Sequence, residues 1–329
     1  MIFNINRRHF GITLTLGTAL PAWTQTTTPD VRFNRSITIV VPYPPGGTTD
    51  LLARVVAPQL GERIGQSVMV DNRAGAGGVI GSQFVSRAAP DGSTLVFATI
   101  ASHGIIPALQ KHPPYDPVRD FAPVTLVAST PNVLLVNNDL PVKTLVDLLA
   151  LAHTKPGTLN FGSTSLGGSP HMSGELLKLM AKIDIVHVPY KGGGPMMVDL
   201  MSGQVQMGFD NLPSAMSHIR GGKVRALAVT TATRWPGALE IPTMAEAGVP
   251  GYEMSAWFGL LASRNTPAAI TAALQREVAV VLKRPEIEKQ FFDLGAAPGG
   301  NTPEEFANYI AADHDKWVRV GASSGVTLE

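Results

Sequence analysis

The sequence predicts an α/β protein of two lobes, each a mixed β-sheet flanked by helices, joined by two extended interdomain crossings. Three observations support this prediction. Short β-branched runs alternate with helical patterns along most of the chain, which is typical of strand–helix–strand units. The 329 residues suffice for two domains of ordinary size. Extended, proline-flanked stretches interrupt the alternation near residues 124–131 and 252–260.

The first block of elements consists of three β-branched or apolar runs with helical patterns between them. Leu52, Val56 and Leu60 recur at a spacing of four residues, which places them on one face of a helix. The expected elements are strands at Ile37–Val41, Val68–Asp71 and Leu95–Thr99, a helix at Asp50–Ile64 and another that ends near Arg87.

The second block begins beyond the proline-studded stretch 113–123. Two apolar runs separated by Ser129-Thr130-Pro131 are expected as two strands, after which the strand–helix alternation restarts. The expected strands are Val124–Ala128, Val133–Val136, Leu159–Gly162, Ile185–Pro189, Gln206–Phe209, Ala226–Thr230 and the long Trp257–Ala262. The expected helices are Leu145–Ala152, Pro170–Ile183 and Pro195–Met201.

Two helices are expected to close the chain. Each opens with a threonine followed by proline, at Thr266-Pro267 and Thr302-Pro303, which is typical of a capped helix start. Glu305 stands three residues after Thr302 and completes a capping box.

The composition excludes several classes of function. Lys and Arg are scattered and the formal net charge is +1, so no basic stripe is available to neutralise phosphates, and we expect no nucleic-acid partner. The chain has no cysteine, which rules out disulfides, thiolate metal sites and a cysteine nucleophile. The eight histidines show no paired metal spacing. We therefore expect neither a metal nor a cofactor.

The N-terminus predicts export. Arg7 and Arg8 precede a weakly apolar run from Phe10 to Ala22, followed by a polar stretch. This is the layout of a secretory signal, and the run is too short for a stable membrane anchor. The segment Asn6–Phe10 also resembles a twin-arginine signal, so the Sec and twin-arginine routes both remain open. We expect a signal peptide over residues 1–24, with its end between 22 and 28.

Three loops between a strand and a helix carry the most chemical information: Pro42–Asp50, Gly162–Pro170 and Tyr190–Pro195. Loops of this kind leave the same edge of a parallel sheet. Their glycines let backbone N–H groups approach a ligand, and each following helix has unpaired amides at its positive end. An anionic group, especially a carboxylate, suits this environment.

Simpler explanations exist for each feature. Glycine and small residues occur in strand–helix turns of every α/β protein, His171 is equally well explained as a solvated or locally satisfied side chain, and Asp210-Asn211 fits an Asx turn. A secreted hydrolase is an alternative to a binding protein. The segment Ser163–Gly167 is a near miss to a nucleophile elbow, but Ser165, His171 and Asp210 follow one another in the wrong order for that fold. Gly75–Gly81 does not fit the dinucleotide fingerprint.

Several blocks of the sequence are specific when taken together. They are Val41–Asp50, Asn72–Gly78, Pro114–Pro117, Asp120–Val124, His187–Gly192, Phe209–Pro213, Pro242–Thr243 and Glu246–Gly248. With these blocks the chain resembles the Bug-type receptors, the extracytoplasmic substrate-binding components of tripartite tricarboxylate transporters. The resemblance covers the mature chain from about Ile37 to its end.

The resemblance implies a periplasmic-binding-protein fold of the type II-like class, with two interdomain crossings, that closes on a carboxylate-bearing solute. It implies that the Tyr43–Thr49 loop holds a carboxylate and that Ser163–Ser169 forms the opposite wall. Ala101-Ser102-His103 and Tyr43 depart from the residues common in relatives and lie beside the expected pocket. The candidate ligand-binding residues are Tyr43, Pro45, Gly46, Gly47, Thr48, Thr49, Ser102, Ser163, Thr164, Ser165, Gly168, Ser169, His171, Tyr190, Lys191, Gly192 and Asp210.

We therefore expect a monomeric periplasmic receptor, not an enzyme. Residues 31–128 and 257–329 would form one lobe and residues 129–256 the other. Its ligand would be a dicarboxylate, tricarboxylate, acidic amino acid or aromatic acid, and integral-membrane transporter subunits would be its partners. The alternatives are a sensing receptor that acts on a membrane signalling partner and a secreted hydrolase.

Overall fold

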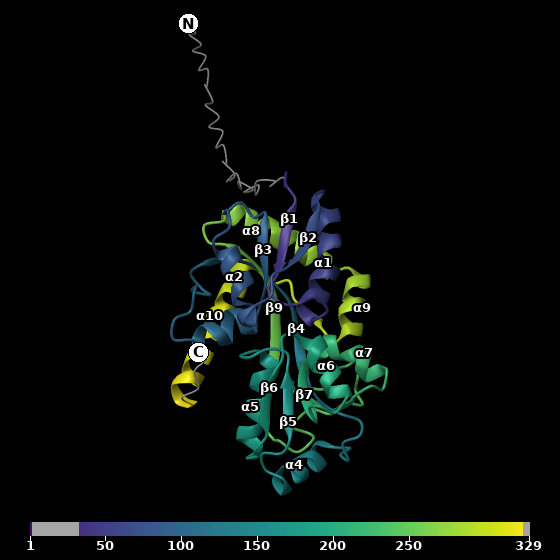
Figure 1. Ribbon diagram of the computed structural model, residues 1–329. Helices are drawn as coiled ribbons and strands as arrows, with labels where there is room; N and C mark the ends of the chain where they lie inside the picture. Colours follow the sequence, from purple (N-terminus) through teal and green to yellow (C-terminus); the bar gives the residue numbers. More distant parts are fainter. Residues whose placement is uncertain (2–32, 325–329) are drawn as a thin grey trace.

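The computed structural model describes Met1 and residues 33–324, so the expected signal peptide lies outside the described residues apart from Met1. The described strands form one curled sheet in the order β2-β1-β3-β9-β4-β7-β5-β6, with β8 and β10 both paired to β4. Helices cover both halves of this sheet, and β4 and β9 run between the halves (Figure 1). The α/β fold predicted from the sequence is confirmed.

The half that contains the first described residues is built on three parallel strands. They are β1 (Ile37–Val41), β2 (Val68–Asn72) and β3 (Thr94–Thr99). Their connections are α1 (Thr48–Ile64), the short turn η1 (Ala76–Gly78) and α2 (Val79–Ser86). A π-helical turn, η2 (Ala101–Ile105), and α3 (Ile106–Leu109) follow β3 directly. Parallel pairing brings the loops after β1 and β3 to the same sheet edge.

The other half repeats the pattern. Its strands are β5 (Asn160–Ser163), β6 (Val186–Pro189), β7 (Met207–Asn211) and β8 (Arg225–Val229). Its helices are α4 (Leu145–Thr154), α5 (Ser169–Ala181), α6 (Gly193–Met201) and α7 (Leu212–Arg220). Because β5 runs parallel to both β6 and β7, the loops that precede α5, α6 and α7 leave one common edge.

Two long strands connect the halves. The segments Val124–Ala128 and Val133–Val136, expected as two strands, are parts of one, β4 (Phe121–Val136), which pairs antiparallel with β9 (Ser255–Ser263). Pairing with β9 ends at Pro131, and pairing with β7 and β8 begins at the next two residues. A proline lacks a backbone N–H, so it fits where β4 changes partners. The prediction of two separate strands was therefore wrong.

The C-terminal segment contains one helix more than expected. It consists of α8 (Ala268–Leu282), α9 (Pro285–Leu294), β10 (Ala297–Pro298) and α10 (Pro303–Ser324). The capping box before α10 is confirmed, because Thr302 N donates to Glu305 and Glu305 N donates to Thr302 Oγ1. Thr266 does not cap α8, since its hydroxyl donates to the carbonyl of Ser263.

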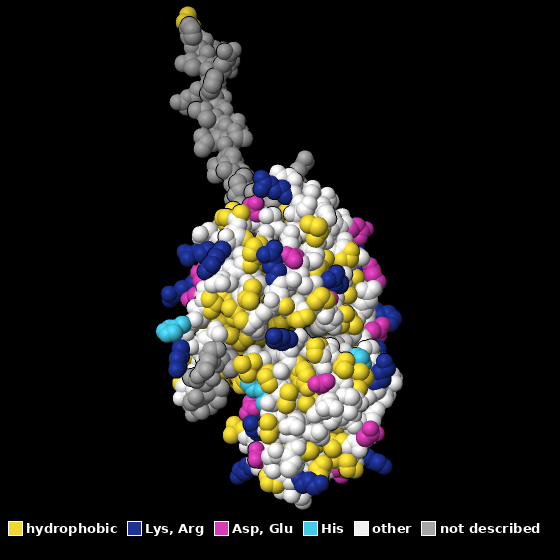
Figure 2. Space-filling model, in the orientation of Figure 1, with side chains coloured by type: hydrophobic (Ala, Val, Ile, Leu, Met, Phe, Trp, Pro, Cys, Tyr) yellow, Lys and Arg dark blue, Asp and Glu magenta, His cyan; other side chains and the backbone are white. Residues whose placement is uncertain are grey.

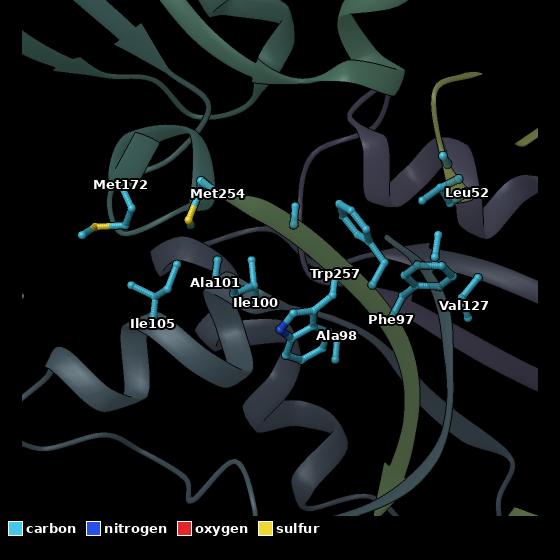
Figure 3. Packing of buried hydrophobic residues seen from close by; sticks show 14 of the residues in the cluster. Leu52, Phe97, Ala98, Ile100, Ala101, Ile105, Val127, Met172, Met254 and Trp257 are labelled. Carbon is cyan, nitrogen blue, oxygen red and sulfur yellow. The ribbon is translucent and has the colours of Figure 1, made fainter. Parts of the chain in front are cut away.

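A buried apolar cluster extends from one half into the other. It includes Trp257 of β9 and Phe97 of the neighbouring strand β3, and Met172 of α5 and Met254 lie opposite Ile100 and Ile105 (Figure 3). The two halves therefore meet through apolar packing in addition to the paired strands. At roughly 25 cal/mol per Å² of apolar surface removed from water, such packing favours the contact of the halves seen here.

Candidate functional site

A central cavity, partly open to solvent, lies between the two halves of the sheet. Tyr43, Thr48 and Thr99 contribute from the β1–β3 half, and Ser165 and Asn211 from the β5–β8 half. Phe258 of β9 also lines the cavity, next to the strands that connect the halves. Segments far apart in sequence thus enclose one space.

Four helix N-termini open onto this cavity. The N-cap residues of α1, α5, α6 and α7 are Gly47, Gly168, Gly192 and Asn211; all four line the cavity, and none makes a side-chain capping hydrogen bond. The first N–H groups of a helix have no partner within the helix, and its dipole places partial positive charge there. An anion in the cavity would face several such helix ends.

Ten of the predicted site residues line the cavity together: Tyr43, Gly47, Thr48, Thr49, Thr164, Ser165, Gly168, Ser169, Gly192 and Asp210. The other seven lie elsewhere. Pro45, Gly46 and Lys191 are exposed outside the lining. Ser102, Ser163 and His171 are buried behind the walls, and Tyr190 is half-buried behind the third loop.

A hydrogen-bonded chain supports the wall beside β3. The Tyr43 hydroxyl lies 2.7 Å from Thr99 Oγ1 and donates to the carbonyl of Gly77. Burial raises the pKa of Tyr43 to about 12, so the phenol stays neutral. Ser102 accepts from Thr99 N and lies 2.9 Å from His103 Nδ1. Ser102 thus acts here as a support for Thr99, one layer behind the cavity.

Two stacked imidazoles support the opposite wall. The rings of His171 and His187 lie 3.9 Å apart at an interplanar angle of 17°. Gly167 N donates to His171 Nδ1, and His187 Nε2 lies 2.7 Å from Ser163 Oγ. Burial lowers the pKa of both histidines, that of His187 to about 3, so both rings are neutral at ordinary pH. The pair holds the 163–169 loop from behind.

Asp210 is the one acidic side chain among the residues that line the cavity. It is the second-to-last residue of β7 and is 2% exposed. Its Oδ1 accepts from Asn211 N and from Ser214 Oγ, both at 2.7 Å. Burial raises its pKa to about 7. Its partners do not include Ser165 or His171, since His171 Nδ1 accepts from Gly167 N, and these three residues form no Ser-His-Asp triad.

Sequence reasoning missed several residues that line the cavity, among them Thr99, Asn211, Ser214 and Phe258. Thr99 and Asn211 are the last residues of strands that were predicted or partly predicted, so the rule that ligands meet the carboxyl ends of parallel strands could have found them. Ser214 and Phe258 carry no local signal. They reach the cavity only because α7 and β9 pass beside it.

One buried amide ties two of these helix N-termini to β4. Asn132 Nδ2 donates to Ser173 Oγ of α5, and its Oδ1 accepts from the Ser169 hydroxyl and from Asn211 Nδ2. Asn132 is fully buried, and leaving a buried polar group without partners costs about 1–3 kcal/mol. It therefore positions the starts of α5 and α7 relative to the connecting strand.

The lining offers backbone amides, hydroxyl groups and one carboxyl group, without a lysine or arginine. Across the described part of the chain, no three His, Asp or Glu side chains gather as they would around a metal ion. None of the described helices has the length and apolar character of a membrane span. On the face seen in Figure 2, acidic and basic side chains are interspersed.

Two α/β halves that turn helix N-termini toward a shared cavity, joined by two long strands, define the class of periplasmic solute-binding receptors. Residues 52–325 match the sequence model of the tripartite tricarboxylate transporter family receptors, and the chain belongs to this family. It is therefore a receptor of the Bug type, as the sequence blocks predicted.

Three similar proteins match this chain in sequence or in fold over nearly its whole length. BugT of Bordetella pertussis is 37% identical over 297 residues, which cover 90% of this chain and 91% of that protein. A solved Rhodopseudomonas palustris protein with adipate is 40% identical, with a TM-score of 0.87 over 89% of this chain and 98% of that chain. MatC from R. palustris, with bound malate, is 33% identical, with a TM-score of 0.82 over 87% and 99% of the two chains.

Proposed function

We propose that this chain captures a small carboxylate in the central cavity and delivers it to integral-membrane transporter subunits. One observation supports this most strongly: the N-termini of α1, α5, α6 and α7 all open onto the cavity, and none of their N-cap residues makes a side-chain capping hydrogen bond. In α7, Ser214 N already donates to Thr48 Oγ1. A carboxylate satisfies such N–H groups, and each charge-assisted hydrogen bond contributes about 1.5–3 kcal/mol. A few of these bonds suffice for a micromolar ligand, which requires about −8 kcal/mol.

Two similar proteins support the ligand class. Their structures hold adipate and malate, which are small dicarboxylates. Because the lining has no lysine or arginine, recognition would rest on preorganised amides and hydroxyl groups, and this favours modest affinity.

We further propose that capture is a flytrap closure of two lobes. Residues 31–128 and 257–329 form one lobe, residues 129–256 form the other, and β4 and β9 serve as the hinge. This division is supported by the cavity between the two halves of the sheet, where Thr48 Oγ1 on α1 donates to Ser214 Oγ on α7. Closure would exclude water from the ligand and strengthen its hydrogen bonds.

A thermal-shift screen tests the ligand class. The purified chain is heated alone and with dicarboxylates, tricarboxylates, acidic amino acids and aromatic acids, and each acid is compared with its amide. A ligand at 100 times its dissociation constant stabilises by about 2.7 kcal/mol, so we expect an active acid to raise the melting temperature by several degrees. The matched amide should not. A panel in which no acid acts, or in which acids and amides act alike, would contradict the proposal.

Delivery to a transporter is tested in cells. Deletion of the gene for this chain should abolish uptake of the radiolabelled acid found in the screen, and a plasmid copy should restore it. Unchanged uptake in the deletion strain would argue against a role in transport while leaving the binding function intact.

A further inference from the structure

Asp210 is a buried carboxyl group with one oxygen left for a ligand. Its Oδ1 is used by Asn211 N and Ser214 Oγ. Among the described residues, no hydrogen bond reaches Oδ2. This oxygen lies near the N-terminus of α6, where a Cβ added to Gly193 would be 3.2 Å away, and both Asp210 and Gly193 line the central cavity.

Among the described residues, no positive side chain pairs with Asp210. The charged and titratable groups on the neighbouring elements either pair with other residues or lie away from the cavity. Asp50 on α1 is paired with Arg54. Asp199 on α6 accepts from the Tyr190 hydroxyl, and His218 and Arg220 lie in the last turn of α7, at the end away from the cavity. Lys191 is exposed and does not line the cavity.

Asp50 shows what a buried aspartate needs in order to remain ionised. It accepts hydrogen bonds from Arg54, Asn72 and Gly46 N, and these partners hold its pKa below the usual range. No arginine pairs with Asp210, and hydrogen bonds reach only its Oδ1 among the described residues. Burial therefore raises its pKa. A ligand carboxylate would bring a second negative charge into the same poorly solvated space, where two carboxylates cannot both stay ionised easily.

We propose that Asp210 takes up one proton from solvent when a carboxylate binds, and that its neutral carboxyl group then donates a hydrogen bond from Oδ2 to the ligand carboxylate. This inference rests on the proposed function and specifies how the site distinguishes its ligand. The four helix N-termini hold the negative charge, and Asp210 contributes a donor that carries no charge of its own. Bound this way, a dicarboxylate keeps both of its own carboxylates ionised.

Isothermal titration calorimetry measures the number of protons taken up per bound ligand. Adipate, malate, citrate and benzoate are titrated at pH 8 in two buffers with different ionisation enthalpies. The acids are fully ionised at this pH, so we expect protein groups to take up close to one proton per bound ligand. With benzoate, whose carboxyl group is still ionised at about pH 6, uptake should approach zero at that pH, because Asp210 is already protonated. Affinity should fall by up to tenfold per pH unit as the pH rises above 7.

Asp210→Asn imitates the neutral acid and still accepts from Asn211 N and Ser214 Oγ. We expect it to bind within a few-fold of the wild-type affinity at pH 6, with neither proton uptake nor dependence on pH. Asp184→Asn, an exposed site in the same half, should behave as wild type. Binding to wild type without uptake at pH 8 overturns the inference and leaves the proposed function standing. A tenfold loss in Asp210→Asn at pH 6 also overturns it. Failure of all four acids to bind contradicts the proposed function itself.

Discussion

Glycines at the cavity serve different purposes. Gly192 has a φ of +111°, a conformation in which any side chain is strained. A Cβ on Gly168 would meet Ser165 Oγ within the protein. Gly47 differs from both, because its φ is −79° and an added Cβ would meet only the carbonyl of Pro44, at 3.9 Å. The fold therefore tolerates a side chain at Gly47. The space beside this glycine is part of the cavity and is not filled by other protein atoms.

Gly47→Val should abolish ligand binding with little effect on the fold. The added methyl groups would enter the cavity and block the N-terminus of α1, so calorimetry should detect no binding. The free energy of unfolding should fall by only about 1 kcal/mol or less, since the main cost is that valine is a poorer N-cap than glycine. Gly194→Val is the matched control, because that glycine also has open space around its Cβ and does not line the cavity. Unchanged affinity in Gly47→Val would remove the first loop from the site.

The elements meet across the cavity through α1 and α7. The first turn of each helix contributes one hydroxyl: Thr48 Oγ1 donates to Ser214 Oγ at 3.1 Å and accepts from Ser214 N at 3.3 Å. Ser214 also donates to Asp210. Gly192 approaches Pro44 over the same gap, since a Cβ there would be 3.3 Å from Pro44 Cγ. These contacts join helices that belong to different proposed lobes.

Thr48→Val should favour an open conformation. Valine keeps the shape of threonine but removes both hydrogen bonds to Ser214, so the closed state loses about 0.5–1.5 kcal/mol per bond. Small-angle X-ray scattering of the ligand-free protein should show a larger radius of gyration than wild type. Thr48→Ser, which keeps the hydroxyl, should match wild type. Identical scattering from the valine variant would show that this contact does not hold the lobes together.

The stability of the whole molecule depends on pH through a histidine buried in its core. His103 is fully buried and packs against Tyr115 and Phe121. Burial lowers its pKa from 6.5 to about 3. Between these two pH values the unfolded chain binds a proton that the folded chain does not. The free energy of unfolding therefore decreases as the pH falls from about 6.5 toward 3.

His103→Gln should flatten this acid response. Urea unfolding measured from pH 7 to pH 4 should show a shallower loss of stability than wild type, with a difference of at most about 1.4 kcal/mol per pH unit. His153→Gln, at an exposed position in the last turn of α4, should keep the wild-type slope. Equal slopes in both variants would show that His103 does not dominate the acid response.

Elements with strong local signals were predictable. Ile37–Val41 forms a strand as expected, because β-branched residues favour extended backbone, and the glycine loops do end at helix starts. The α7 helix was missed, since Pro213 and polar residues obscure its short apolar pattern. The continuity of β4 through Pro131 was also missed, because it depends on strands paired to it from distant parts of the chain.

The sequence by itself determined the alternation of strands and helices, the glycine loops and the family, because these properties are encoded in local pattern and in blocks of neighbouring residues. Only the tertiary structure decided that Thr48 meets Ser214 and Asp210 across one cavity, and that Ser102 and His171 lie behind its walls. The physical reason is that a cavity is formed by contacts between segments more than a hundred residues apart. Burial, which sets the charge of Asp210, exists only once those segments have packed.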